Sequence, residues 1–222
     1  DHKLAWYEND GSEGFPEHAL STSANGAMSV YAADLDGDGD MDALSASYHN
    51  NKIAWYENDG SASFTEHAVS MSASGAYSVY TADVDDDGDM DVLSASYSDN
   101  KIAWHENDGS ESFTSHTVAN SAGGAVWVHA ADVDGDGDVD MLSASVNDDK
   151  IAWYENDGSE SFTTRNISTS ADQATTVHVA DLDGDGDMDV LSASQRDDKF
   201  ALSLIHISEP TRPERIWYAV LW

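Results

Sequence analysis

A segment of 49 residues repeats through this 222-residue chain without an insertion or a deletion. The string Ala-Trp-Tyr-Glu-Asn-Asp-Gly begins at Ala5, Ala54 and Ala152, and a copy with His in place of Tyr begins at Ala103. An aspartate-rich string recurs at the same spacing from Asp34 onwards. A fixed period of this length indicates a protein built from similar supersecondary units, each of which buries its apolar face against the next.

Each unit contains four short segments that are typical of β-strands. They are rich in β-branched, aromatic and small residues, and none has a sustained helical period. Between the third and fourth segments, Asp59-Gly60 predicts a hairpin with a type I′ turn, because this pair tolerates positive φ. In the first complete unit the predicted strands are residues 27–33, 41–47, 52–58 and 63–69.

Four strands in about 49 residues match one blade of a β-propeller. We therefore predict an all-β chain of three whole blades and two half blades, with the repeated Trp55 between neighbouring blades. The chain begins with the third and fourth strands of one unit and ends with the first and second of another. The two halves either join into a composite fourth blade or belong to a longer array, and we expect the second. The predicted units are 1–20, 21–69, 70–118, 119–167 and 168–199.

The last part of the chain, residues 200–222, departs from the repeat. The period predicts Ile-Ala-Trp-Tyr-Glu-Asn from position 200, but the chain reads Phe-Ala-Leu-Ser-Leu-Ile. The segment Leu202–Arg212 resembles the translated sequence of a transposase adapter used in sequencing libraries. We therefore interpret 200–222 as a non-native tail and exclude it from functional reasoning.

The aspartate-rich string forms a loop between the first and second predicted strands of each unit. Carboxylates occupy loop positions 1, 3, 5, 7 and 9, and Gly39 and its copies occupy position 6, where a sharp turn is needed. Several oxygens converging on one point suit a hard divalent cation such as Ca²⁺. The candidate metal ligands are Asp34, Asp36, Asp38, Asp40 and Asp42; Asp83, Asp85, Asp87, Asp89 and Asp91; Asp132, Asp134, Asp136, Asp138 and Asp140; and Asp181, Asp183, Asp185, Asp187 and Asp189.

Electrostatic repulsion is the reason to expect an ion in each loop, about four in all. Two carboxylates 4 Å apart repel by roughly 1 kcal/mol in water and by about 4 kcal/mol at an effective dielectric of 20. We predict that positions 1, 3 and 5 bind through side chains, position 7 through its main-chain carbonyl, and position 9 from the next strand. The alternative is a solvated acidic turn. An EF-hand is excluded because position 12 is Ser45 or another Ser rather than Glu.

These loops carry a family resemblance. The D-x-D-x-D-G-x-x-D pattern over residues 1–199 resembles FG-GAP/VCBS-type repeats, the calcium-binding propeller repeats of integrin α-subunit heads and of many secreted bacterial proteins. The resemblance implies propeller blades and calcium, with the aspartates above as ligands. Asp86 replaces the Gly at position 4 of the second loop, and the literal Phe-Gly and Gly-Ala-Pro dipeptides of the family are absent.

Other repeated residues have simpler interpretations. His18, His67 and His116 share one repeat position, and we expect surface strand positions rather than a zinc cluster because the repeat places them on successive blades. Trp55-Tyr56 and its copies are either a sugar-stacking platform or core, and core packing is expected. Glu8 and its copies recur once per unit, as scaffold residues do. Near-identical units offer no asymmetric constellation for catalysis, so we predict a protein that is not an enzyme.

Composition limits the partners. The chain has 43 Asp+Glu against 9 Lys+Arg, a net charge of −34, which disfavours nucleic acid and anionic lipid. No apolar run is long enough for membrane insertion. We predict a calcium-binding extracellular or cell-surface module for adhesion or for binding a protein or glycan. The alternative is a non-catalytic scaffold part of a secreted polysaccharide-degrading enzyme. Open blade edges also predict a tendency to self-associate.

Overall fold

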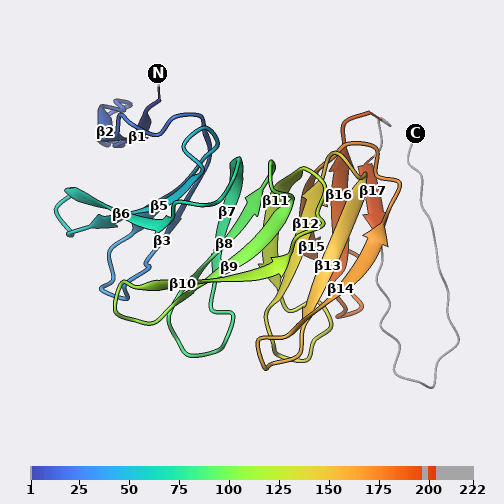
Figure 1. Cartoon of the computed structure of the whole chain (residues 1–222). Coiled ribbons are helices and arrows are strands. Elements are labelled where there is room, and N and C mark those ends of the chain that lie inside the picture. Colours follow the sequence, from blue (N-terminus) through green and yellow to red (C-terminus); the bar gives the residue numbers. More distant parts are fainter. Residues whose placement is uncertain (1, 197–199, 204–222) are drawn as a thin grey trace, which may run out of the picture.

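The structure is a computed structural model of the chain, and it describes residues 2–196 and 200–203. The described residues form seventeen strands and no helix, which confirms the all-β prediction. The strands build five antiparallel sheets, of which three have four strands (Figure 1). In every sheet the strand order follows the chain, so each is a simple meander.

The strands are distributed over the five sheets in the order of the chain. The first sheet contains β1 (Leu4–Tyr7) and β2 (Glu17–Ser21). The three complete sheets contain β3 (Ala27–Ala33), β4 (Asp42–Ser47), β5 (Lys52–Asn58) and β6 (Phe64–Ser70); β7 (Ala76–Ala82), β8 (Asp91–Ser96), β9 (Lys101–Asn107) and β10 (Phe113–Ala119); and β11 (Ala125–Ala131), β12 (Asp140–Ser145), β13 (Lys150–Asn156) and β14 (Phe162–Ser168). The last sheet contains β15 (Ala174–Ala180), β16 (Asp189–Ser194) and β17 (Phe200–Ser203).

The predicted strands agree with the observed ones to within a residue at each end. The last strand, β17, lies in the segment that we assigned to the tail. It pairs with β16 so that Phe200 faces Ala193, the register in which Ile53 of β5 faces Ala46 of β4. The remainder of that segment, 204–222, lies outside the described residues.

The hairpin after the third strand is confirmed, but its predicted type I′ turn is wrong. A type I′ turn needs positive φ at both central residues, whereas here Gly60 and Ala62 have positive φ and Asp59 does not. The loop has five residues, and the Asp59 main-chain N–H donates to the Ser63 carbonyl at 3.1 Å. The Asp59 carboxylate accepts hydrogen bonds from the Ser61 N–H at 2.9 Å and from the Ser61 hydroxyl at 2.6 Å. These side-chain contacts stabilise the longer loop.

The core lies between successive sheets. Trp55 is 1% exposed and belongs to the same buried cluster as Val79 and Val92 of the following sheet. Trp104 and Trp153 occupy the same place in the next two interfaces. This confirms that the repeated tryptophan fills the space between units. Each sheet therefore depends on its neighbour to bury its apolar face.

The sheets form a row in which β3, β7, β11 and β15, the first strands of their sheets, lie side by side in that order (Figure 1). The N-terminal and C-terminal sheets lie at opposite ends of this row. The composite fourth blade, considered as an alternative from the sequence, is therefore not formed by the described residues. Repeated four-stranded antiparallel sheets are established, and closure of such sheets into a ring is not seen.

Candidate metal centre

The aspartate-rich loops connect the first and second strands of four sheets, as predicted. Each loop turns sharply at position 6, where φ is between +94° and +99° in Gly39 and its three copies. A residue with a Cβ would be strained in this conformation. Position 9 is the first residue of the second strand, so its side chain is held by the sheet while positions 1 to 8 curl beside it.

Carboxylates converge within each loop. In three loops, one ligand oxygen from each of positions 1, 3 and 9 lies within 4.8 Å of the other two. In the third loop the converging residues are those at positions 1, 3 and 5. The four groups are Asp34, Asp36 and Asp42; Asp83, Asp85 and Asp91; Asp132, Asp134 and Asp136; and Asp181, Asp183 and Asp189.

The aspartate at position 9 is the anchor of the loop. Asp91 is fully buried, and its two oxygens accept hydrogen bonds from the main-chain N–H of Val84 at 2.9 Å and of Asn107 at 2.8 Å. These two bonds tie the start of the loop to the end of the third strand. Burial nevertheless raises the pKa of Asp91 and of its copy Asp140 to about 6, because desolvation outweighs the hydrogen bonds.

The aspartates at positions 1 and 3 provide the test of whether a cation fits. The Oδ1 atoms of Asp34, Asp85 and Asp134 are buried and have no hydrogen-bond partner. A buried carboxylate oxygen without a donor is unfavourable unless a cation faces it. Desolvation also raises the pKa of the position-3 carboxyls, with neighbouring aspartates adding to the rise, in Asp36, Asp85, Asp134 and Asp183. The residues present therefore fit a hard divalent cation.

Positions 5 and 7 differ from positions 1 and 3. The side chain at position 5 accepts a hydrogen bond from the main-chain N–H at position 7, as between Asp38 and Asp40 at 2.8 Å. The side chain at position 7 is outside the converging group in every loop. In the first loop the side chain of Asp40 lies so close to Gly60 of the hairpin that a Cβ at position 60 would collide with its carboxylate. This agrees with the prediction that position 7 binds the ion through its main-chain carbonyl. That role and the individual ligand assignments remain predictions.

A neighbouring sheet completes the surroundings of a loop. Asn107 is 3% exposed and donates from Nδ2 to the carbonyl of Leu35 at 2.9 Å, across the interface to the preceding loop. Asn156 makes the equivalent bond to Val84 at 3.1 Å. The sequence alone indicates no role for these asparagines, although they are part of the string that recurs in every unit. Their partners lie 72 positions away, so no local pattern reveals them.

The other repeated residues have the expected structural roles. The pair Trp55-Tyr56 and its copies Trp104-His105 and Trp153-Tyr154 are buried, which confirms core packing in these three units. In the first unit Trp6 is half-buried and Tyr7 is 56% exposed. His67 stacks on Trp55 with ring centroids 4.6 Å apart, and His18 and His116 stack in the same way on the tryptophans of their own units. The three histidines are therefore on separate sheets and do not form a shared cluster. In the fourth copy Arg165 lies over Trp153 and pairs with Glu155.

Antiparallel four-stranded repeats with one aspartate loop per unit define a class of all-β repeat protein with a candidate cation site in each repeat. The chain belongs to the FG-GAP-like repeat family, which matches residues 1–45, 34–94, 83–143 and 132–192. Every match contains at least one complete acidic loop. None of the curated proteins matches the sequence.

Two solved structures show the same kind of fold at low sequence identity. The biofilm matrix protein Bap1 of V. cholerae aligns with a TM-score of 0.50 and 19% identity over 90% of this chain. The chain spans about a third of that protein, 32% of its length. A candidate 6-phosphogluconolactonase from Bacteroides uniformis aligns with a TM-score of 0.53 and 11% identity, over 99% of this chain and 82% of that one. The described residues include no helix that could span a bilayer.

Proposed function

We propose that this chain is a calcium-stabilised β-propeller segment that acts as an extracellular adhesion or ligand-binding module and not as an enzyme. The observation that carries the proposal is the convergence of three carboxylates in each of four loops, with a buried unpartnered oxygen in three of them. Bound calcium would offset the electrostatic repulsion between these carboxylates and hold the first and second strands of each sheet together. The residues that would hold it are the converging aspartates at positions 1, 3, 5 and 9.

The chemistry of the loops supports the proposed location outside the cell. Oxygen-only sites of the extracellular class fill at about 10⁻⁴–10⁻³ M calcium, a concentration that is not reached in the cytosol. The family membership and the fold shared with a protein that is named as a biofilm matrix component support an adhesive role. The partner would be a protein or a glycan, and the net charge of −34 favours a partner that does not carry phosphates.

Calcium titration tests the proposal. Calorimetry on the calcium-free chain should give about four ions per chain. Chelation should lower the melting temperature by at least about 10 °C, because occupied sites at 10 to 100 times Kd contribute about 1.4–2.7 kcal/mol each and 1 kcal/mol corresponds to about 2–4 °C. Addition of calcium should restore the melting temperature. A chain that binds no calcium, or melts at the same temperature without it, would contradict the proposal.

A further inference from the structure

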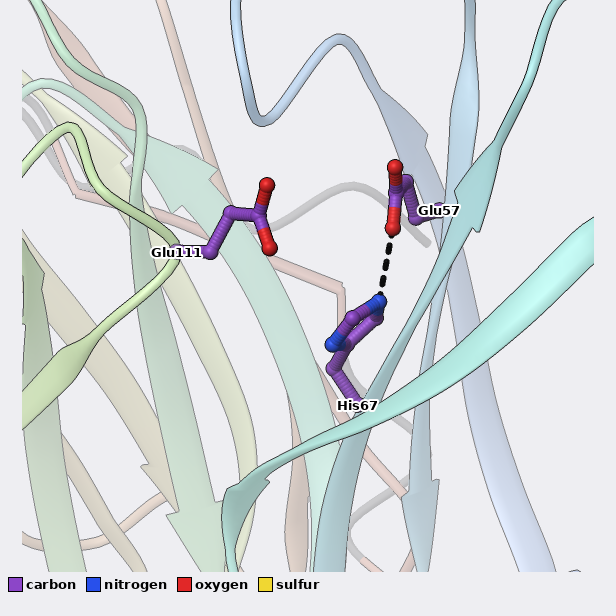
Figure 2. Close-up of side chains that lie close together, drawn as sticks. All are labelled: Glu57, His67 and Glu111. Carbon is purple, nitrogen blue, oxygen red and sulfur yellow. Dashed lines mark hydrogen bonds and ion pairs between the residues drawn. The ribbon is translucent and has the colours of Figure 1, made fainter.

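A second type of ligand cluster lies between two sheets, outside the aspartate loops. Glu57 of β5 and His67 of β6 belong to one sheet, and Glu111 belongs to the hairpin between β9 and β10 of the next (Figure 2). One ligand atom from each of the three lies within 4.8 Å of the other two. In Figure 2 the carboxylate of Glu111 points toward the pair that Glu57 and His67 form.

The imidazole is held in a fixed position. His67 stacks on the buried Trp55 with ring centroids 4.6 Å apart and planes at 28°, and its Nε2 lies 2.7 Å from Oε2 of Glu57. The side chains of Glu57 and His67 are about a third exposed, at 30% and 29%, so an ion can reach them from solvent. Stacking removes the rotational freedom that a metal-binding histidine otherwise loses on binding.

Glu111 is an unbalanced negative charge at this place. In the part of the chain that the structure describes, it makes no hydrogen bond or ion pair, although it faces the carboxylate of Glu57. A histidine carries at most one positive charge, whereas two glutamates carry two negative charges. A divalent cation would balance the two carboxylates and bond to both sheets.

We propose that Glu57, His67 and Glu111 form a binding site for a divalent transition metal, with Zn²⁺ as its test ion. One imidazole nitrogen with two carboxylate oxygens is a donor set that zinc accepts, with water in the remaining position. Calcium prefers oxygen ligands alone, so the imidazole separates this site from the aspartate loops. When zinc binds, it replaces the proton between Nε2 of His67 and Glu57, and that proton is released or moves to Nδ1.

The other units show which residues complete the site. For the pair Glu8 and His18, the repeat position equivalent to Glu111 is Ala62, so that pair lacks a third ligand. In the last copy Arg165 replaces the histidine and pairs directly with Glu155, which leaves no nitrogen for a metal. Glu106, His116 and Glu160 repeat the proposed ligands, but the structure does not bring their ligand atoms within 4.8 Å.

Zinc binding to the full chain without an affinity tag tests the proposal. Calcium is kept at about 10 mM, above the range in which the aspartate loops fill. Glu111→Gln removes one ligand, and His67→Arg introduces the residue that occurs naturally at the equivalent position 165. Each variant should bind one zinc ion fewer than the natural sequence, or bind that ion at least about tenfold more weakly. The experiment measures the difference in zinc binding between each variant and the natural sequence, so a second zinc site elsewhere in the chain does not affect the result.

Glu13→Gln is the matched control, because Glu13 occupies the hairpin position of Glu111 in the first unit and is not part of the cluster. This variant should bind as much zinc as the natural sequence. Calcium stoichiometry and circular dichroism verify that all variants are folded. The proposal is overturned if folded Glu111→Gln and His67→Arg proteins bind zinc with the natural stoichiometry and affinity, or if the control loses the same ion.

Discussion

At the scale of single residues, position in the loop separates aspartates that look alike in the sequence. Asp85 at position 3 is in the converging group and has a buried oxygen without a donor. Asp89 at position 7 lies outside this group, and its side chain lies against Gly109 of the hairpin. The two residues are four positions apart and differ in their surroundings, because the loop directs one carboxylate toward the converging group and the other toward the hairpin.

This difference gives a prediction for a matched pair of variants. Asp85→Asn should reduce the number of bound calcium ions by one, because a carboxylate of the converging group is lost. Asp89→Asn should leave the count unchanged, since its proposed contribution is the main-chain carbonyl. Calorimetric titration of both variants measures the counts. Equal losses in the two would show that the side chain at position 7 is also a ligand.

At the scale of secondary-structure elements, the last residue of the third strand bonds to the preceding sheet in two of the units. Asn107 donates to its own unit at the carbonyl of Met90, at 3.2 Å, and to the preceding loop at Leu35. Asn58 is the equivalent residue one unit earlier, and the bond it makes from Nδ2 is to Met41 of its own unit, at 3.1 Å. The first sheet has no acidic loop to offer a second acceptor. The two asparagines therefore differ by one contact between sheets.

We expect Asn107→Ala to destabilise the chain more than Asn58→Ala. Removal of Asn107 leaves the buried carbonyl of Leu35 without a donor, which costs about 1–3 kcal/mol. Asn58→Ala removes the same bonds within the unit and so serves as the control. Urea unfolding in saturating calcium measures the free energy of unfolding of each variant. Equal losses would indicate that the bond between sheets contributes nothing to stability.

At the scale of the whole molecule, stability depends on how the negative charge is balanced. The chain carries a net charge of −34, and its fully buried carboxyls Asp91 and Asp140 have pKa values raised to about 6 by desolvation. In the unfolded chain these groups titrate near 4. Between about pH 4 and pH 6 the calcium-free folded chain therefore retains protons that the unfolded chain releases.

We predict that the calcium-free chain is more stable at pH 5 than at pH 7. Its stability falls as pH rises through this window, because each buried carboxyl loses its proton at a penalty of roughly 3 kcal/mol for a displacement from 3.8 to about 6. With saturating calcium the stability of the chain should instead rise with pH, since the ion binds deprotonated carboxylates. Thermal melts at both pH values, with and without calcium, measure this. A calcium-free chain that melts higher at pH 7 would contradict the prediction.

The sequence by itself determined the parts of this protein that depend on local chemistry. The 49-residue period predicted the repeated four-stranded sheets, the strands of a complete unit to within a residue, the position of the acidic loops and the buried role of Trp55. Alternation, turn residues and clustered charge act between near neighbours, so one unit contains the signal. The prediction of a type I′ turn at Asp59 was wrong. The hydrogen bonds from Ser61 to the Asp59 carboxylate favour a five-residue loop over the common two-residue loop.

Only the tertiary structure decided what happens between units. It placed Asn107 against Leu35, set Glu111 opposite Glu57 and His67, and selected which carboxylates of each loop converge. These contacts depend on how one sheet is rotated and shifted relative to the next. Packing of side chains from two distant segments sets that geometry, and a repeat pattern within one segment does not contain it.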